Sequence, residues 1–345
     1  MKLITLAAIA ASVATLASCA QNSTKPASTQ AAQTAFDDHV HKTGETQSHD
    51  EGKSAAHDKM AHGSTVHNHS TRLNISSVPS LIQAGKSATM TLQIVDKASG
   101  KPVNDYEVVH DKKLHFIVVS NDLKFFNHIH PRFVGNGKFQ IKTTLPRAGS
   151  YRLYADYKPR GEEGEVALQQ ITVGGAKLST SSTRLVADTP RGSWFVKNVA
   201  SHDEGVEPTA NAARYQVALM PMPSRIEAGK DVMLHFQVRD ANGKPLSKLE
   251  PYLGAQGHCV ILSSDPKTYL HTHPMDASHD MGAMKMDEGA TKMSEKNHAN
   301  ETAKTGADVM FHTNFPSAGL YKVWGQFKHN GKIISAPFVV NVSAA

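Results

Sequence analysis

A pattern of histidines occurs twice in this chain of 345 residues. The spans 115–131 and 258–274 have equal length, and each begins with a histidine and ends in His-x-His-Pro. The histidines in register are His115, His128 and His130 in the first span and His258, His271 and His273 in the second. Residues i and i+2 of an extended chain point to the same side, so each His-x-His pair can present two imidazoles to one point. Such a set of neutral imidazoles predicts a transition-metal site, for Cu(II) or Zn(II).

The same histidines also allow a structural interpretation. His115 and His258 could be satisfied core residues while the His-x-His pairs stay exposed in turns. Alternatively, the histidines could bind one another or backbone carbonyls and so fix a loop. The repetition favours metal binding, but twelve residues separate His115 from His128. The sequence therefore leaves open whether the three histidines of a span converge in space.

A methionine-rich insertion, 275–307, follows the second histidine span, at a place where the first span is followed only by a short turn. Its candidate ligands are Met275, His279, Met281, Met284, Met286, Met293 and His298. The thioether of methionine is a soft ligand that selects Cu(I) over hard cations. The insertion has few aliphatic residues and no periodicity, so we expect an auxiliary copper-binding loop and no core. The alternative is a linker that happens to be rich in these residues.

The N-terminus has the pattern of a sorting signal. A short apolar run after Lys2 ends in Leu-Ala-Ser-Cys at 16–19, which resembles a bacterial lipobox. This pattern predicts a signal peptide over 1–18, lipid attachment to Cys19 and a membrane partner through that anchor. Residues 19–70 are polar and rich in histidine, which predicts a disordered tether with low metal selectivity. We expect a lipoprotein of the bacterial envelope, most simply the outer membrane, facing either the periplasm or the cell surface.

The chain has only two cysteines. If Cys19 carries lipid, Cys259 has no partner for a disulfide, and stability must come from a hydrophobic core. A blue-copper site needs a cysteine with two histidines. Strand alternation, however, points Cys259 away from its neighbour His258, and the first repeat has Phe116 at the matching position. We therefore predict that Cys259 is a buried core residue.

The histidine spans belong to an internal duplication. The motif at 82–86 recurs at 226–230, and the Pro-x-Ala-Gly-x-Tyr motif at 146–151 recurs at 316–321. Apolar residues alternate with polar ones in segments bounded by Gly-Lys-Pro turns, as is typical of strands. This predicts an all-β protein of two tandem Ig-like or cupredoxin-like β-sandwiches, at 71–174 and 214–345, with a linker at 175–213. The Ala-Gly-x-Tyr entry to a late strand resembles a tyrosine corner.

Three motifs together resemble the YtkA-like family of exported bacterial Ig-like or cupredoxin-like domains. They are the histidine span, the Pro-x-Ala-Gly-x-Tyr motif and the closing strand at 336–342. The resemblance covers most of 71–343 and implies a β-sandwich fold. For function it implies only a general association with metal-handling proteins of the envelope.

These observations predict an envelope lipoprotein that binds copper, with zinc as the alternative metal, and acts as a buffer, chaperone or resistance factor. Another metal-transport protein of the envelope would be its partner. The first alternative is an Ig-like interaction module with structural histidines, and the second is a His-ligated metalloenzyme. We expect no enzyme, because Asp122 and Asp265 are the acids common to both spans and are better suited to shaping a turn. The chain carries a net charge of +6 but no basic and aromatic motif for nucleic acid.

Overall fold

The computed structural model describes residues 66, 70–176, 185–274 and 307–345, all of which lie within one compact unit, His57–Ala345. The predicted signal peptide, the lipidation site Cys19, nearly all of the tether and the candidate ligands of the insertion lie outside the described residues. Among the described residues there is no helix long and apolar enough to cross a membrane.

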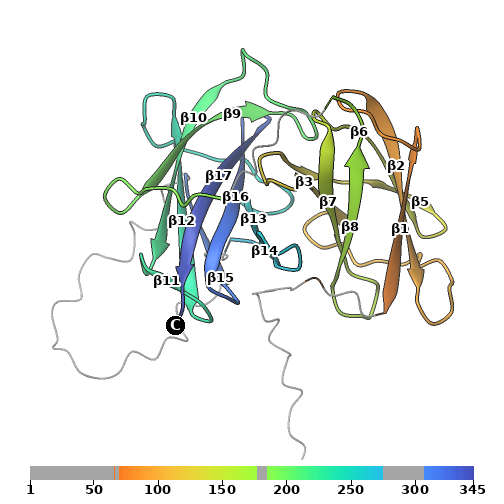
Figure 1. Ribbon diagram of the computed structural model, residues 1–345. Coiled ribbons are helices and arrows are strands. Elements are labelled where there is room, and N and C mark those ends of the chain that lie inside the picture. Colours follow the sequence, from red (N-terminus) through yellow and green to blue (C-terminus); the bar gives the residue numbers. More distant parts are fainter. Residues whose placement is uncertain (1–65, 67–69, 177–184, 275–306) are drawn as a thin grey trace, which may run out of the picture. The chain divides into compact units, whose positions relative to one another are not determined.

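The first repeat is built from two four-stranded antiparallel sheets, labelled in Figure 1. Its strands are β1 (Thr71–Val78), β2 (Ser87–Asp96), β3 (Leu114–Ser120), β4 (Phe126–Ile129), β5 (Arg132–Gly135), β6 (Lys138–Thr144), β7 (Gly149–Tyr157) and β8 (Glu165–Val173). The sheets have the orders β1-β2-β6-β5 and β4-β3-β7-β8. Their inner faces enclose a core that includes Leu92, Phe116, Phe139 and Leu153, all fully buried. The short strand β5 stands where the sequence indicated only a turn.

The second repeat has the same arrangement of strands. They are β10 (Arg214–Met222), β11 (Ile226–Glu227), β12 (Asp231–Asp240), β13 (His258–Ser263), β14 (Tyr269–Thr272), β15 (Asp308–Asn314), β16 (Gly319–His329) and β17 (Lys332–Ser343). The order β14-β13-β16-β17 reproduces β4-β3-β7-β8, and β10-β12-β15 reproduces β1-β2-β6. The predicted fold class, two tandem β-sandwiches, is confirmed.

The segment between the repeats contributes one further strand, β9 (Phe195–His202). It pairs with β10 over six residue pairs, from Arg214↔Ala200 to Leu219↔Phe195. It also pairs with β17 at Ile333 and Ile334, and so joins the two sheets of the second sandwich along one edge.

Both repeats contain the predicted tyrosine corner. The hydroxyl of Tyr151 donates to the carbonyl of Arg147 at 2.9 Å, and the hydroxyl of Tyr321 donates to the carbonyl of Ser317 at 2.8 Å. Each tyrosine is buried at the start of its strand, β7 or β16. These bonds fix how the chain enters the strand that lies beside the first histidine of each span.

Both faces of strands β3 and β13 are buried, and a different neighbour covers each face. On β3, Phe116 and Val118 point into the core of their own sandwich. Ile117 points the other way, into an apolar cluster shared with Val260 and Leu262 of β13. We call this contact between the outer faces of β3, β4 and β7 and those of β13, β14 and β16 the junction.

Aromatic side chains pack across the junction in two matching pairs. Phe126 stacks on Trp324 with ring centroids 4.5 Å apart, and Tyr269 stacks on Tyr154 at 5.2 Å. In the alignment of the repeats Phe126 corresponds to Tyr269 and Tyr154 to Trp324. Each repeat therefore offers the same surface to the other, as in a two-fold symmetric dimer.

Candidate metal centre

The strand register brings the histidines of each span to the outer face of their sheet. His115 is the second residue of β3, and the β3–β4 hairpin pairs His128 with Ile117. The side chain of Ile117 lies on the junction face, so His128 and His115 share that face. In the second repeat, His271 pairs with Val260, another junction residue, and therefore shares the face of His258.

The three histidines of each span converge. His115 Nδ1 lies 3.0 Å from His128 Nε2 and 3.1 Å from His130 Nε2. His258 Nδ1 lies 3.3 Å from His271 Nε2. In each span, one nitrogen from every histidine lies within 4.8 Å of the others. We call these two groups the first triad (His115, His128, His130) and the second triad (His258, His271, His273).

In each histidine of the first triad, one ring nitrogen faces the other two histidines, and we call it the inner nitrogen. The other, outer nitrogen donates a hydrogen bond to an acceptor outside the triad. His115 Nε2 donates to the carbonyl of Val109 at 3.0 Å. His128 Nδ1 donates to Gln326 Oε1 at 2.8 Å, and His130 Nδ1 donates to Glu204 Oε1 at 2.7 Å. A neutral imidazole has only one N–H, so the three inner nitrogens carry lone pairs.

The second triad has a matching set of partners. His258 Nε2 donates to the carbonyl of Tyr252 at 3.0 Å, and His271 Nδ1 donates to Asp156 Oδ2 at 3.0 Å. His273 Nε2 is buried and has no hydrogen-bond partner among the described residues. The inner nitrogens of neutral His258 and His271 therefore also lack hydrogens to share.

Burial favours the neutral form of most of these histidines. It lowers the pKa of His115, His128 and His258 well below the ordinary histidine value, and the neighbouring imidazoles lower the pKa further. Burial is also the main cause that lowers the pKa of His271 to about 3. Lone pairs that face one another at about 3 Å without a proton repel, and a bound cation turns this repulsion into attraction. The donor set, three imidazoles with their outer N–H groups fixed, is the one that Cu and Zn sites use.

The two triads lie against each other across the junction. The ring centroids of His115 and His271 are 5.1 Å apart, and those of His128 and His271 are 5.3 Å apart. Within the first triad, the ring centroids of His115 and His128 are also 5.3 Å apart. The six histidines therefore form a single cluster, where the spacing in the sequence suggested two separate sites.

Each repeat also supplies a hydrogen-bond partner to the triad of the other repeat. Asp156 on β7 bonds to His271 and accepts a second hydrogen bond from the hydroxyl of Tyr269 at 3.1 Å. Gln326 occupies the matching position on β16 and bonds to His128. Neither residue stood out in the sequence, because their role depends on how the sandwiches dock.

A seventh histidine was also missed. His110 stacks on His273 with centroids 3.2 Å apart and lies edge-on to His258 at 5.7 Å. It belongs to the first repeat but contacts the second triad. Its counterpart in the second repeat is Leu253, so the comparison of the repeats gave no signal for it. Both residues have positive φ, +48° and +54°, in matching tight turns before β3 and β13.

Two other predictions about single residues can be checked. Cys259 is a free, fully buried cysteine of the second core, and burial raises the pKa of its thiol. Asp122 and Asp265 shape turns, since each accepts a backbone N–H two residues further on, from Lys124 at 3.1 Å and from Lys267 at 3.0 Å. None of the three belongs to a triad.

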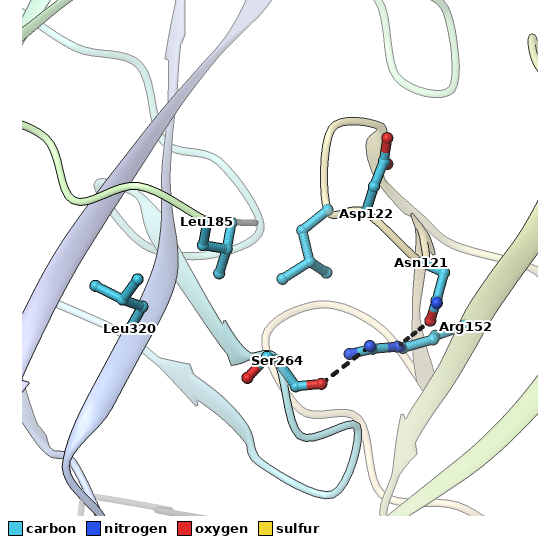
Figure 2. Close-up of a pocket in the computed structure, with 7 residues that line it drawn as sticks. Asn121, Asp122, Arg152, Leu185, Ser264 and Leu320 are labelled. Atoms are coloured by element: carbon cyan, nitrogen blue, oxygen red, sulfur yellow. Dashed lines mark hydrogen bonds between the residues drawn. The ribbon is translucent and has the colours of Figure 1, made fainter. Parts of the chain in front are cut away.

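A pocket lies at the opposite end of β3 and β13 from the histidines at the start of these strands. Figure 2 shows Arg152 reaching across it, bonded to Asn121 of its own repeat and to Ser264 of the other. Arg152 also donates to the carbonyl of Ser263 at 3.3 Å. Its guanidinium is therefore engaged in holding the two repeats together.

The fold and the cluster define a protein of two docked β-sandwiches with a buried group of histidines between them. The chain belongs to a family described as a domain of unknown function, DUF8832, whose model matches residues 64–174 and 210–344. Both matched segments are the repeats described above. The matching family model is not that of the YtkA-like family, which the sequence motifs resemble. No curated protein matches the chain.

Solved structures with a related fold include Ig-like domains. The Escherichia coli adhesin FdeC is 16% identical with a TM-score of 0.22, and the match covers 82% of this chain and 65% of the adhesin chain. A putative membrane-anchored protein from Corynebacterium diphtheriae is 10% identical with a TM-score of 0.20, over 78% of this chain and 57% of that one. Tandem Ig domains of titin are 9% identical with a TM-score of 0.17, over 80% of this chain and 98% of that one.

Proposed function

We propose that this chain binds transition metal, most favourably copper, at the histidine cluster between its two β-sandwiches. The observation that supports the proposal is the direction of the lone pairs. In the first triad, a backbone carbonyl, an amide oxygen and a carboxylate take the three outer N–H groups, so the three inner nitrogens face one another as acceptors. A structural network of histidines would alternate donors and acceptors, because each shared hydrogen bond needs one of each.

Copper fits this set better than most divalent ions. Affinity for nitrogen ligands rises along the first-row series to Cu(II) and falls again at Zn(II), and imidazole suits both metals. Calcium and magnesium take oxygen ligands, and the converging atoms in both triads are nitrogens. The predicted methionine-rich loop between β14 and β15 would favour Cu(I) in the same protein.

A role in holding or passing on the metal suits the cluster better than catalysis. Five of the six histidines have outer nitrogens fixed by hydrogen bonds. Burial lowers the pKa of four of these five, which keeps these four from acting as acids near neutral pH. With the lipobox at Cys19, the proposal is an envelope-anchored copper buffer or chaperone.

The test is a metal titration of the full chain against a competing chelator that strips weak sites. Cu(I) is added without oxygen, and Cu(II) and Zn(II) are added in air. The variant H130Q/H273Q changes the two least buried cluster members, and H312Q changes a surface histidine on β15 as a matched control. We expect two tight equivalents of copper to disappear in the double variant and to persist in the control. Tight binding that is the same in all three proteins would place the sites elsewhere and refute the proposal.

The second candidate is an Ig-like interaction module in which the histidines are structural. The similarity to Ig-like domains of an adhesin concerns the fold alone and is consistent with this candidate. This candidate predicts no tight metal in the same titration. It also predicts that each triad holds a shared proton, which would appear as hydrogen-bonded imidazole N–H resonances in the metal-free protein.

A further inference from the structure

We infer that the two triads form one binuclear centre, in which two metal ions lie close enough to interact and are held jointly by both repeats. The inference rests on the proposed function and adds to it the number of ions and their arrangement. It also assigns Asp156, Gln326 and Glu204 as positioning residues of this centre.

The spacing of the rings supports two neighbouring ions. The closest rings from different triads, those of His115 and His271, have centroids 5.1 Å apart, while the rings of His115 and His130 within one triad are 5.0 Å apart. The three converging nitrogens of each triad define one ion position, and further ring pairs from the two triads, His128 with His258 and His115 with His258, have centroids 5.9 Å and 6.2 Å apart. Protein sites with two metal ions place them about 3.5–4 Å apart. Three imidazoles for each ion leave at least one coordination position that its own triad does not fill.

Each half of the centre depends on the other repeat. His271 is oriented by Asp156 of the first repeat, and His128 is oriented by Gln326 of the second. Histidine ligands whose second nitrogen is held by a carboxylate or amide keep one ring orientation and one tautomer. Docking of the sandwiches therefore completes both ligand sets at once, and one isolated repeat would lack part of the support for its triad.

The charge of the surroundings matches a pair of cuprous ions. Two carboxylates contact outer nitrogens of the cluster, Glu204 at His130 and Asp156 at His271. Two negative charges offset two Cu(I) ions. Two Cu(II) ions leave two positive charges, which favours an anion such as hydroxide between them, formed when a bound water releases a proton to solvent.

The test uses electron paramagnetic resonance on the full chain loaded with Cu(II) to the tight equivalents. The spectrum of H130Q/H273Q, treated in the same way, is subtracted to remove copper bound outside the cluster. The single variant H130Q leaves the second triad intact. We expect wild-type protein to show either loss of most of the cluster signal, through a bridging anion, or a half-field signal from two coupled spins. H130Q should show one uncoupled Cu(II) at full intensity.

X-ray absorption on the Cu(I)-loaded protein gives an independent reading, with a copper–copper scattering path at about 3.5–4 Å expected in wild type and absent in H130Q.

Two tight ions with a full-intensity, uncoupled spectrum would overturn the binuclear centre and leave the proposed function intact. A single tight ion per chain, lost equally in H130Q and H273Q, would also overturn the binuclear centre and would indicate one ion shared by both triads. No tight copper at all would refute both. Circular dichroism and the urea midpoint of each variant verify that it is folded.

Discussion

At the scale of single residues, the buried histidines determine how the protein responds to protons. In the folded chain burial favours the neutral form of His115 and His128, and two imidazole nitrogens lie within 3.1 Å of His115 Nδ1. In the unfolded chain they return to the ordinary histidine pKa of about 6.5. A group whose pKa is lower in the folded state binds protons preferentially when unfolded, so it destabilises the fold as the pH falls.

We therefore expect the metal-free protein to lose stability as the pH falls from 7.5 to 5. The window starts near the unfolded pKa of about 6.5. It extends down toward the folded value, which is about 3 for His271. Each histidine that stays neutral at pH 5 contributes a loss of about 2 kcal/mol. The measurement is the free energy of unfolding in urea, with a metal chelator present, at several pH values.

Acidic residues should contribute little in this window. The pKa of Asp105 is lowered by its hydrogen bond from Arg160, and the pKa of Glu107 is lowered by its hydrogen bond from Lys158, so both carboxylates stay charged throughout this window. The surface variant H312Q should retain the full pH dependence. A free energy of unfolding that stays level between pH 7.5 and 5 would mean that the cluster already holds protons in the folded state.

At the scale of the elements, two hairpins and two late strands carry the cluster. The β3–β4 and β13–β14 hairpins set which histidines share a face, and β7 and β16 bring Asp156 and Gln326 beside them. The second sandwich is tightly packed around β16 at one position where the two repeats differ. Gly325 on β16 stands where the first repeat has Ala155, and a Cβ atom at Gly325 would lie 2.5 Å from the ring of Phe236.

The substitution Gly325→Ala should destabilise the second sandwich by about 1–3 kcal/mol, because the enclosed ring of Phe236 must shift to admit the methyl group. Phe236 is fully buried and packs against Phe311 and Phe338 in the second core. Gly164→Ala is the matched control, since nothing lies within 4 Å of an added Cβ there. Urea unfolding of both variants measures the difference. Equal stability of G325A and wild type would show that the core adapts without cost.

At the scale of the whole molecule, the junction makes two repeats into one functional unit. Apolar side chains, two stacked aromatic pairs and hydrogen bonds to Arg152 and Tyr154 hold the repeats together. The tight docking places the triads together at one end of β3 and β13 and the Arg152 pocket at the other (Figure 2). Metal bound at the cluster should therefore stabilise the docked arrangement, because a ligand stabilises the state that binds it.

The substitution Arg152→Met should lower the free energy of unfolding by about 2–3 kcal/mol, since it leaves the carbonyls of Ser263 and Ser264 without their charged donor. Arg160→Met removes an exposed ion pair with Asp105 and is the matched control. It should cost no more than about 1 kcal/mol. The metal titration described above adds a second readout, with weaker copper binding expected in R152M. Unchanged stability and copper affinity in R152M would show that the junction does not depend on this residue.

The sequence by itself determined the duplication, the all-β fold and the inward position of Cys259, and it pointed out the six histidines. These features follow from short-range rules: side chains alternate every two residues along a strand, and a hairpin pairs residues that are close in sequence, such as His115 and His128. Because the rules act within about twenty residues, they hold wherever the repeats lie in space. The two tyrosine corners were predictable for the same reason.

Only the tertiary structure decided that the two triads meet, that His110 joins the second, and that Asp156 and Gln326 each orient a histidine of the other repeat. His128 and Gln326 are 198 residues apart in the chain. The docking of two sandwiches depends on the match of whole surfaces, shape against shape, and no local period in the sequence records that match. The outer face of β3 is apolar, but what covers it could be learned only once both sandwiches were placed.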